Sequence, residues 1–444
     1  MLFGTAGIRG DLMKITPQFA LTIGKSVAIF AERRKYDHVT VGKDGRTSSD
    51  MVAEAVKAGI LSEGVPVVDG GRIPTPVLAF ATDHCGIMVT ASHNPPDNNG
   101  MKVFNNHREL YPQEEREIEE IVASLHSRPL WKLPGIEEVH YIPDYEKAVL
   151  AYVEKEFGTI YSGKRIVLDC GNGMGALVTP HILKKMGCDI IPLFAEVTGK
   201  FERPPEPSEK NISLLKETVL QEGADMGIAQ DGDADRINVV DEKGCIISED
   251  SIIALLAGYY VNPGDCVVTS IDTSFRIDEY VSKKGGHTKR VMLGNLHEGI
   301  PQHNAIFAGE PWKHIHIRFG TWIDGIVSTT FLAKFIVQKE ASQLCSDIHE
   351  YPVEKINIKT EDRISMVNLF RNKVNDFPDI RDVATVSGIR INFSDGSWIL
   401  VRPSGTEPKI RVIIEGVTPQ KFELLRKFVN LTLDESKSLY SIVN

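Results

Sequence analysis

Apolar residues follow two alternating patterns along the first 360 residues of the chain. Short runs rich in β-branched residues predict strands, and apolar positions spaced by three or four residues predict helices. In the first part, these patterns predict helices at 16–33 and 49–63 and strands at 38–41, 65–68 and 86–89. The first helix opens with Thr16 as N-cap and Pro17 at the first helical position. An alternation of strand, helix and strand is typical of a parallel sheet.

The same alternation restarts twice and then gives way to a different pattern. Strands are predicted at 165–168, 189–193, 226–229, 266–269, near 291 and at 305–308, with helices from 179 and at 211–222, 277–284 and 295–303. After about residue 360, a helix at 365–375 precedes three consecutive strands at 388–393, 397–401 and 409–414, and a last helix begins at Thr418-Pro419. We expect an α/β fold of three similar units with mixed sheets, 1–148, 149–250 and 251–360, and a smaller C-terminal α+β domain, 361–444.

Composition narrows the class of protein. Of the 444 residues, 42% are hydrophobic and 25% charged, as in ordinary folded proteins, and 50 basic against 60 acidic residues give a net charge of −10, which argues against a nucleic-acid partner. No apolar run approaches the roughly 18 residues of a membrane span, and no signal peptide is visible, so we expect a cytoplasmic protein without a membrane partner. The six cysteines form no CxxC pair, which argues against zinc clusters and against disulfides. The oligomeric state stays open.

The sharpest polar segment follows the strand predicted at 86–89. It reads TASHNP over 90–95, and NGMK follows over 99–102. Because ligands of α/β proteins bind beyond the carboxyl ends of strands, we expect Ser92 to face a crevice, accompanied by His93 and Lys102. The alternative is that this serine only caps a turn.

A second loop, DGDADR over 231–236, also follows a predicted strand. Its three carboxylates stand at alternate positions: Asp231, Asp233 and Asp235. Like charges this close repel one another unless a cation holds them, and oxygen ligands favour magnesium, calcium or manganese over zinc. The spacing to Glu242 fits an EF-hand, but Arg236 stands where that motif needs glycine and the flanks are predicted strands, so we reject it. An acidic turn without an ion remains the alternative.

Two further regions suit anions and sugars. The segment RPSGTEPKIR lies over 402–411 between two predicted strands, and its cations, hydroxyls and glycine suit a phosphate. Its candidate ligands are Arg402, Ser404, Gly405, Thr406, Lys409 and Arg411. In the segment GEPWKH over 309–314, Glu310 and His314 are candidates for hydrogen bonds to sugar hydroxyls, and near the N-terminus Arg9 is a candidate for contact with an anion. Each segment also has an ordinary structural alternative as a turn or a packing surface.

Taken together and in this order, the four loops resemble the α-D-phosphohexomutase family, which includes phosphomannomutase/phosphoglucomutase and phosphoglucosamine mutase. The resemblance covers essentially the whole chain, and its most specific segments are TASHNP, DGDADR and RPSGTEPKIR. Supporting segments are FGTAGIRG at 3–10, GKDGRTSS at 42–49, PTP at 74–76, NGMK at 99–102, LDCGNGMG at 168–175 and PEP at 205–207. With one functional loop in each unit, we expect the four units to surround a central cleft.

The resemblance implies a mechanism and a set of site residues. Ser92 is expected to carry a phosphoryl group, and one Mg²⁺ per chain is expected on Asp231, Asp233, Asp235 and a phosphoserine oxygen. The reaction interconverts a hexose 1-phosphate and a hexose 6-phosphate through glucose or mannose 1,6-bisphosphate, so the partner is a small phosphosugar. The resemblance assigns Arg9 and Lys102 to proton transfer, with cationic neighbours lowering the pKa of the lysine, and it assigns His93 and Arg236 to steadying the phosphoryl group.

Departures from the family pattern leave the sugar open. The family loop commonly reads Gly-Glu, a variable residue and then Ser-Gly-His or Asn-Gly-Gly, whereas Pro311, Trp312 and Lys313 stand in the middle here. Lys43 also replaces a frequent arginine. Phosphomannomutase/phosphoglucomutase is our first expectation and phosphoglucosamine mutase the alternative. Outside the mutases, a haloacid-dehalogenase-like phosphatase with Asp231 as nucleophile and a non-catalytic module that binds metal and sugar phosphate stay open.

Overall fold

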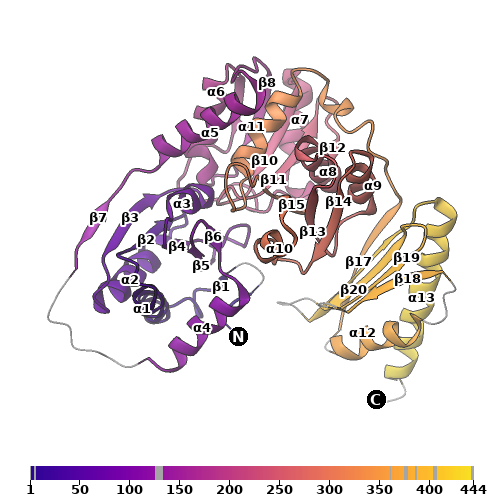
Figure 1. Cartoon of the computed structure of the whole chain (residues 1–444), viewed down its shortest axis with the longest axis horizontal. Helices are drawn as coiled ribbons and strands as arrows, with labels where there is room; N and C mark the ends of the chain where they lie inside the picture. The colour runs from indigo at the N-terminus through magenta and orange to yellow at the C-terminus, as the bar shows by residue number, and fades with distance from the viewer. Residues whose placement is uncertain are drawn as a thin grey trace.

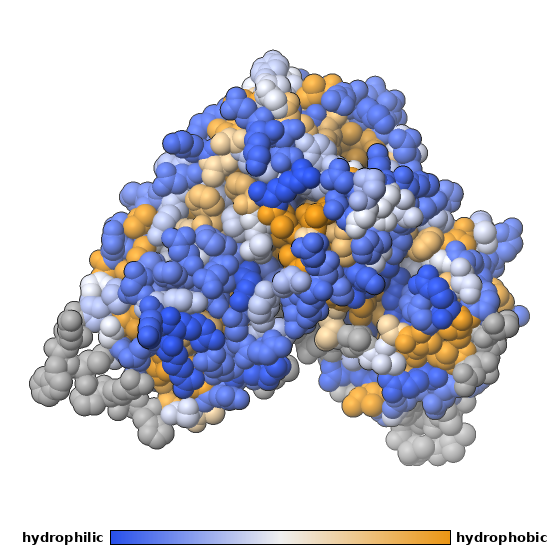
Figure 2. Space-filling model, in the orientation of Figure 1, coloured by the Kyte–Doolittle hydropathy of each residue, from blue (hydrophilic) through white to orange (hydrophobic). Residues whose placement is uncertain are grey.

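The computed structural model describes residues 2–4, 7–125, 134–360, 362–374, 379–385, 388–403 and 408–441, with side chains to residue 435. Its four sheets follow one another along an arc, from the indigo N-terminal unit to the yellow C-terminal unit (Figure 1). In the space-filling view the outline is deeply notched between the first and the fourth unit (Figure 2). The expectation of four units around a central cleft is confirmed.

The first sheet is mixed rather than parallel. Its strands are β1 (Ile8–Asp11), β2 (Val39–Lys43), β3 (Val67–Arg72), β4 (Cys85–Val89), β5 (Asn98–Asn105), β6 (Arg108–Glu109) and β7 (Ile136–Glu138). Strand β2 pairs in parallel with β3 and β4, whereas β5 runs antiparallel to β1, β4 and β6. The accompanying helices are α1 (Pro17–Arg33), α2 (Ser49–Ser62), α3 (Thr75–Ala81) and α4 (Pro112–Ala123). Helix α1 begins as predicted, because Thr16 Oγ1 accepts a hydrogen bond from the Phe19 amide at 3.1 Å.

The second and third sheets repeat this plan with fewer strands. The second contains β8 (Arg165–Asp169), β9 (Asp189–Leu193), β10 (Met226–Gln230), β11 (Ile237–Asp241) and β12 (Ile246–Ile247), and the third contains β13 (Cys266–Ser270), β14 (His287–Val291), β15 (Ala305–Glu310) and β16 (Lys313–Ile315). Their helices are α5 (Ile142–Phe157), η1 (Met174–Leu177), α6 (Thr179–Lys185), η2 (Glu209–Asn211), α7 (Ser213–Glu222), α8 (Glu249–Tyr260), α9 (Phe275–Lys283), α10 (Leu296–His303), α11 (Gly325–Phe335) and η3 (Ala341–Gln343). In both sheets, parallel strands are completed by antiparallel ones on one side.

The fourth sheet is entirely antiparallel, in the order β17-β21-β20-β19-β18. Its strands are β17 (Val353–Lys359), β18 (Ile380–Ala384), β19 (Ile389–Phe393), β20 (Trp398–Pro403) and β21 (Lys409–Glu415), covered by α12 (Arg363–Asn372) and α13 (Pro419–Ser441). Three of these strands and both helices were predicted to within a few residues. The smaller C-terminal α+β unit of the sequence analysis is thus confirmed.

The predicted boundaries between the units cut through elements of the structure. The boundary at 148/149 falls inside α5 and that at 250/251 inside α8, while β17, which ends just before 360/361, pairs along its whole length with β21 of the fourth sheet. Local hydrophobic patterns mark an element but not the sheet that it joins, since that depends on distant partners.

The second and third units share one hydrophobic core. Helix α11 comes from the third unit in sequence, yet it packs against β11, α5 and α6, and Figure 1 shows it beside the strands of the second sheet. Polar contacts reinforce this packing: Ser162 donates to the Ala333 carbonyl at 2.7 Å, and Tyr145 donates to the Asp324 carboxylate at 2.8 Å. The geometry between these two units is therefore fixed by buried surface rather than by a linker.

All four candidate loops occupy the same place in their sheets. Each connects a strand to the antiparallel strand that pairs with it: β4 to β5, β10 to β11, β15 to β16, and β20 to β21. The carboxyl end of the first strand in each pair thus presents its loop at one edge of the sheet.

Candidate active site

Ser92 lies fully buried three residues after β4, in a strained backbone conformation. Its φ of +53° is in the left-handed region that residues other than glycine rarely adopt. The Ser92 amide donates to Thr90 Oγ1 at 2.8 Å, and the Ser92 hydroxyl donates to Asp231 Oδ2 at 2.7 Å. His93 Nδ1 lies 3.3 Å from the same hydroxyl. The serine loop and the acidic loop, far apart in sequence, are thus in direct contact.

A buried arginine that sequence reasoning did not assign holds the serine loop. Arg46 is 1% exposed, and its guanidinium donates to the carbonyl oxygens of Ser92, Asn94, Pro95 and Asn98 at 2.6–3.1 Å. Its Nε pairs with Asp44 Oδ2 at 3.0 Å, and Thr90 donates to that same oxygen at 2.7 Å. The segment GKDGRTSS contained the signal, since an arginine two residues after an aspartate can pair with that carboxylate and still donate to the carbonyl oxygens of a loop.

The acidic loop brings its three carboxylates together as predicted. Asp231, Asp233 and Asp235 are fully buried, and one oxygen from each lies within 4.8 Å of the others. Burial, followed by repulsion from the other two carboxylates, raises the pKa of Asp231 well above its usual value. Asp233 Oδ1 and Asp235 Oδ1 are buried and have no hydrogen-bond partner. Buried acceptors of this kind, arranged around one point, fit a divalent cation with oxygen ligands.

The EF-hand alternative is excluded by the structure. Glu242 accepts a hydrogen bond from the Ser342 amide at 2.9 Å and lies beyond β11, away from the three aspartates. The flanking elements are strands β10 and β11, as the sequence predicted.

Lys102 lies where it was expected, but its protonation differs from the expectation. Its ammonium is 2.7 Å from Asp233 Oδ2 and also contacts Asp235 Oδ2. Burial alone lowers a lysine pKa, yet the negative charges of Asp233 and Asp235 outweigh it and raise the pKa of Lys102. The predicted lowering was wrong, because sequence showed the cationic neighbours but not the two carboxylates across the domain boundary.

Two close approaches dock the acidic loop onto the first unit. Thr75 Oγ1 donates to Asp233 Oδ2 at 2.6 Å, and the Thr75 amide donates to the Asp233 carbonyl at 3.0 Å, which explains the segment PTP at 74–76. A Cβ atom on Gly232 would lie 2.6 Å from the Ser92 carbonyl oxygen. Only glycine therefore allows the two loops to meet here.

Cations surround Ser92 and His93. Arg9 Nη1 lies 3.4 Å from His93 Nδ1, and Arg236, at the end of the acidic loop, lies with its Nε 3.9 Å from Asp235. Burial, and then the cations of Arg236, Arg9 and Lys313, lower the pKa of His93 far below its usual range, so its imidazole is neutral. Arg9 Nε and Nη2 are buried without a hydrogen-bond partner. Such donors are suited to an anionic group in front of Ser92.

The sugar loop presents Lys313 toward this charged region. Glu310 and Lys313 are cross-strand partners in the β15–β16 hairpin, their charged groups lie 3.1 Å apart, and the Gly294 amide donates to the second oxygen of Glu310 at 3.0 Å. His314 takes the opposite face of the strand. Its ring stacks on Phe307 and lies 3.1 Å from the Ser328 hydroxyl, and burial lowers the pKa of His314 to about 3.

The fourth loop is described in part. Arg402 Nη2 lies 3.5 Å from Asp272 Oδ2 of the third unit, and Arg402 faces Arg411 across the β20–β21 pair. Lys409 is half-buried and Arg411 is exposed. The predicted phosphate ligands Ser404, Gly405 and Thr406 lie outside the described residues.

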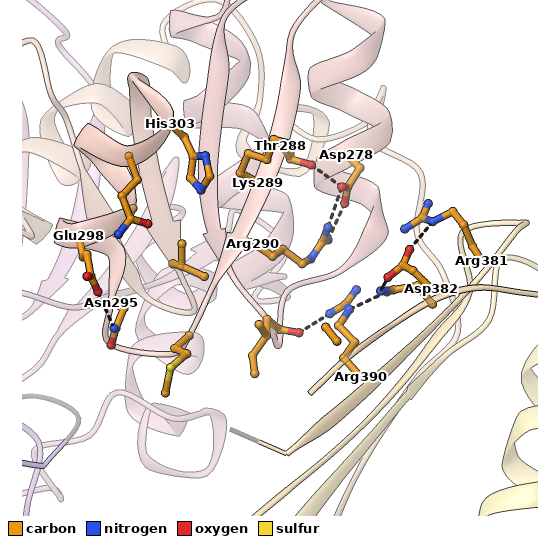
Figure 3. A pocket seen from close by; sticks show the side chains of 17 residues that line it. Asp278, Thr288, Lys289, Arg290, Asn295, Glu298, His303, Arg381, Asp382 and Arg390 are labelled. Carbon is orange, nitrogen blue, oxygen red and sulfur yellow. Dashed lines mark hydrogen bonds and ion pairs between the residues drawn. The ribbon is translucent and has the colours of Figure 1, made fainter. Parts of the chain in front are cut away.

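A cavity of about 670 Å³ separates the third and fourth units, and basic and acidic side chains line it (Figure 3). Arg290 forms a bidentate pair with Asp278, at 2.7 and 2.5 Å. Arg390 donates to the Ile271 carbonyl and stacks on Trp398, 3.8 Å from the ring centre. The described residues that line the cavity include none of those around Ser92, so this cavity is a polar joint between the two units and separate from the Ser92 site.

Comparison with known proteins identifies the class to which this fold and site belong. Four models of the phosphoglucomutase/phosphomannomutase type match in order: alpha/beta/alpha domain I at residues 1–129, domain II at 143–244, domain III at 248–351 and the C-terminal domain at 356–431. The chain belongs to the phosphoglucomutase/phosphomannomutase family, within the α-D-phosphohexomutase superfamily, and is a phosphosugar mutase.

Particular relatives are similar over nearly their whole length. A phosphopentomutase of Thermococcus kodakarensis is 43% identical, with 98% of this chain and 99% of that protein aligned. A probable phosphoglucosamine mutase of Methanopyrus kandleri is 36% identical, with 97% of each aligned. The crystal structure of a phosphoglucomutase/phosphomannomutase family protein of Burkholderia thailandensis superposes with a TM-score of 0.87 at 24% identity, covering 98% and 97% of the two chains, and so shares the fold.

Among the described residues, no helix combines the length and the apolar character needed to cross a membrane.

Proposed function

We propose that this mutase moves a phosphoryl group between the anomeric oxygen and the primary hydroxyl of a sugar, with Ser92 as the carrier. The observation that carries the proposal is the Ser92 hydroxyl itself, buried between Asp231 and His93 and held by a loop that Arg46 fixes. A buried serine hydroxyl on a strained, rigid loop next to charged groups is suited to nucleophilic catalysis.

In the forward half-reaction, a hydroxyl oxygen of the sugar monophosphate attacks the phosphorus of phosphoserine 92. The bond from phosphorus to Oγ breaks as the new bond to the sugar oxygen forms, and a bisphosphosugar results. The sugar then presents its other phosphate, which returns a phosphoryl group to Oγ by the reverse step. Arg9 and Arg236 offset the transferred charge and neutral His93 orients it by hydrogen bonding, while Arg9 and Lys102, the latter as an ammonium group, are our candidates to hold and return the hydroxyl proton.

Asp231, Asp233 and Asp235, together with an oxygen of phosphoserine 92, are the proposed ligands of one Mg²⁺. The buried, unpartnered oxygens of Asp233 and Asp235 support this assignment, and a bound Mg²⁺ would neutralise charge on the transferred phosphoryl group. At the distal end of the sugar, the proposed phosphate ligands are Arg402, Ser404, Gly405, Thr406, Lys409 and Arg411. Glucose or mannose 1,6-bisphosphate is the proposed activator for a hexose substrate.

Three kinds of sugar are candidates. Hexose phosphates are the expectation from sequence, glucosamine phosphate is supported by the relatives named probable phosphoglucosamine mutase, and pentose phosphate is supported by the relative named phosphopentomutase. The phosphatase alternative rested on the acidic loop alone, and membership of the mutase family along the whole chain removes its basis.

The test is a side-by-side assay of ribose 1-phosphate, glucose 1-phosphate, mannose 1-phosphate and glucosamine 6-phosphate, each with the matching bisphosphate and Mg²⁺. Isomerisation of at least one of them, with phosphate retained on the sugar, is the expected result. Release of inorganic phosphate without isomerisation would contradict the proposal.

A further inference from the structure

Lys313 is an unusual feature of the sugar loop. It stands where the common family loop has glycine, and it is only 4% exposed, although lysine is seldom buried to this degree. The one ion-pair partner of its ammonium among the described residues is Glu310. Since an ammonium group has three donors, two of them are left for another acceptor.

The hairpin that carries Lys313 is docked on the acidic loop. The β15–β16 turn is formed by Pro311 and Trp312, and Trp312 has a φ of +68°, a conformation in which glycine is usual. The Trp312 carbonyl accepts a hydrogen bond from the Ile237 amide at 3.1 Å, directly after the acidic loop. This contact fixes the tip of the sugar loop against the loop that carries the three aspartates.

The contacts of the hairpin place the ammonium near the acidic loop. Trp312, the neighbour of Lys313, is held against Ile237, which follows Arg236 directly. Burial raises the pKa of Glu310, but the Lys313 cation and the Gly294 amide outweigh this effect and lower it. Lys313 therefore lies between the sugar loop and the acidic loop, next to the region in front of Ser92 where the substrate of the proposed function would sit.

We propose that Lys313 is a substrate-contacting residue that makes this mutase prefer a five-carbon sugar phosphate to a six-carbon one. Its ammonium, oriented by Glu310, donates its remaining hydrogen bonds to oxygens of the sugar phosphate. Its four-carbon side chain occupies volume that a glycine leaves open, and the additional hydroxymethylene carbon of a hexose competes for that volume. This inference rests on the proposed mutase function and adds the class of sugar to it.

The experiment compares kcat/KM for ribose 1-phosphate and glucose 1-phosphate in the wild type and in two variants. We expect the wild type to prefer the pentose. Lys313→Gly should shift the ratio toward the hexose by about tenfold or more, the usual effect of one carbon in a fitted pocket. Lys313→Met keeps the bulk and loses the charge, so it should raise KM for the pentose more than it lowers kcat, without a gain for the hexose.

Lys243→Met is the matched control, because the Lys243 side chain is 63% exposed and its polar partners within the described part of the chain are Ser342 and Glu242. A wild type that prefers the hexose, or active Lys313 variants with an unchanged ratio, would overturn the inference while leaving the mutase function intact. If Lys313→Gly fails to fold, the sugar preference of the wild type and the kinetics of Lys313→Met still test the inference. A wild type that isomerises no sugar phosphate would overturn the proposed function as well.

Discussion

The hydroxyl of Ser92 donates a hydrogen bond of 2.7 Å to Asp231, although 139 positions separate the two residues in the chain. This contact joins the first unit to the second at the point where the two candidate loops meet. It is accompanied by the Lys102–Asp233 ion pair of 2.7 Å and the Thr75–Asp233 hydrogen bond of 2.6 Å, which cross the same boundary. The reacting serine and the acidic cluster are thus held in place by the fold before any substrate arrives.

Replacing Ser92 by alanine should abolish isomerisation. The carrier oxygen is lost while Arg46 still holds the loop through backbone carbonyls, so the fold should persist. We expect a fall in kcat of about a thousandfold or more, as for other covalent nucleophiles. After incubation with labelled bisphosphosugar, the label should appear on the peptide around residue 92 in the wild type and be missing in the variant. Ser124→Ala is the control, because Ser124 lies exposed at the end of a helix. Full activity of Ser92→Ala would disprove the proposal that Ser92 carries the phosphoryl group.

Asp233→Asn should weaken the dependence on Mg²⁺ and the rate together. Asparagine keeps the shape of the side chain and removes one of three charges that would hold the cation. We expect the Mg²⁺ concentration for half-maximal activity to rise by about tenfold or more, since even outer groups of metal sites have effects of this size. Asp189→Asn, at an exposed ion pair with Arg165, is the control. An unchanged magnesium titration would speak against the proposed metal site.

Arg46→Lys should damage both stability and rate. A lysine ammonium cannot reach four carbonyl oxygens and Asp44 at once, so buried acceptors lose their donors. We expect the free energy of unfolding of the first unit to fall by about 2–4 kcal/mol, which thermal denaturation should detect as a lower midpoint. The value of kcat should fall as the Ser92 loop loosens. Arg33→Lys is the matched control, because the Arg33 side chain is 54% exposed. Equal unfolding midpoints for the two variants would refute the role of Arg46 in holding the serine loop.

Stability should depend on pH through Asp250, near the start of α8. This carboxyl accepts a hydrogen bond from the Ser274 amide at 3.0 Å, and burial raises the pKa of Asp250 to about 7. Because the folded state holds the proton more tightly than the unfolded state, the stabilisation is complete below about pH 4 and is lost as pH rises through 7.

Between pH 5 and pH 8 this loss amounts to about 2–3 kcal/mol at 1.36 kcal/mol per pKa unit. Asp250→Asn keeps the acceptor for Ser274 and removes the titration, so its unfolding midpoint should change less over this interval and exceed that of the wild type at pH 8. Parallel pH profiles for the two proteins would show that Asp250 does not titrate in this range.

The local pattern of apolar and polar residues was sufficient to predict several of the elements that position the site. The strand at 189–193 was predicted with its observed bounds, and the helix that starts after Thr16 with its cap. The serine and the acidic loops were found because their residue types are unusual directly after a strand. Strands β1, β7 and β17 were missed, since each pairs with a strand distant in sequence and no local pattern encodes that pairing. Strand β18 was missed as well, although its partner is the next strand along the chain.

The remaining site features depend on approach between units. Thr75 looks like an ordinary helix-start residue until Asp233 docks on it, and Lys102 gains its protonated state only from carboxylates of the second unit. His314 matched the family motif, but the alternation of side chains along the strand turns it toward Phe307. Its neighbour Lys313 lies on the other side of the strand, where it faces Glu310. A shift of one position along the strand thus determines whether His314 or Lys313 faces the proposed substrate region.

The placement of α11 has a consequence for how the chain can be divided. The helix completes the core of the second unit but is synthesised about 90 residues after the acidic loop, so the second unit has no finished hydrophobic core of its own until the third has been synthesised. A fragment that ends at residue 250 would expose the apolar surface that Ile326, Phe331 and Leu332 help to bury. The second and third units are separate in sequence, but we expect them to unfold together as a single cooperative block. The acidic loop is then held rigid by the packing of both units.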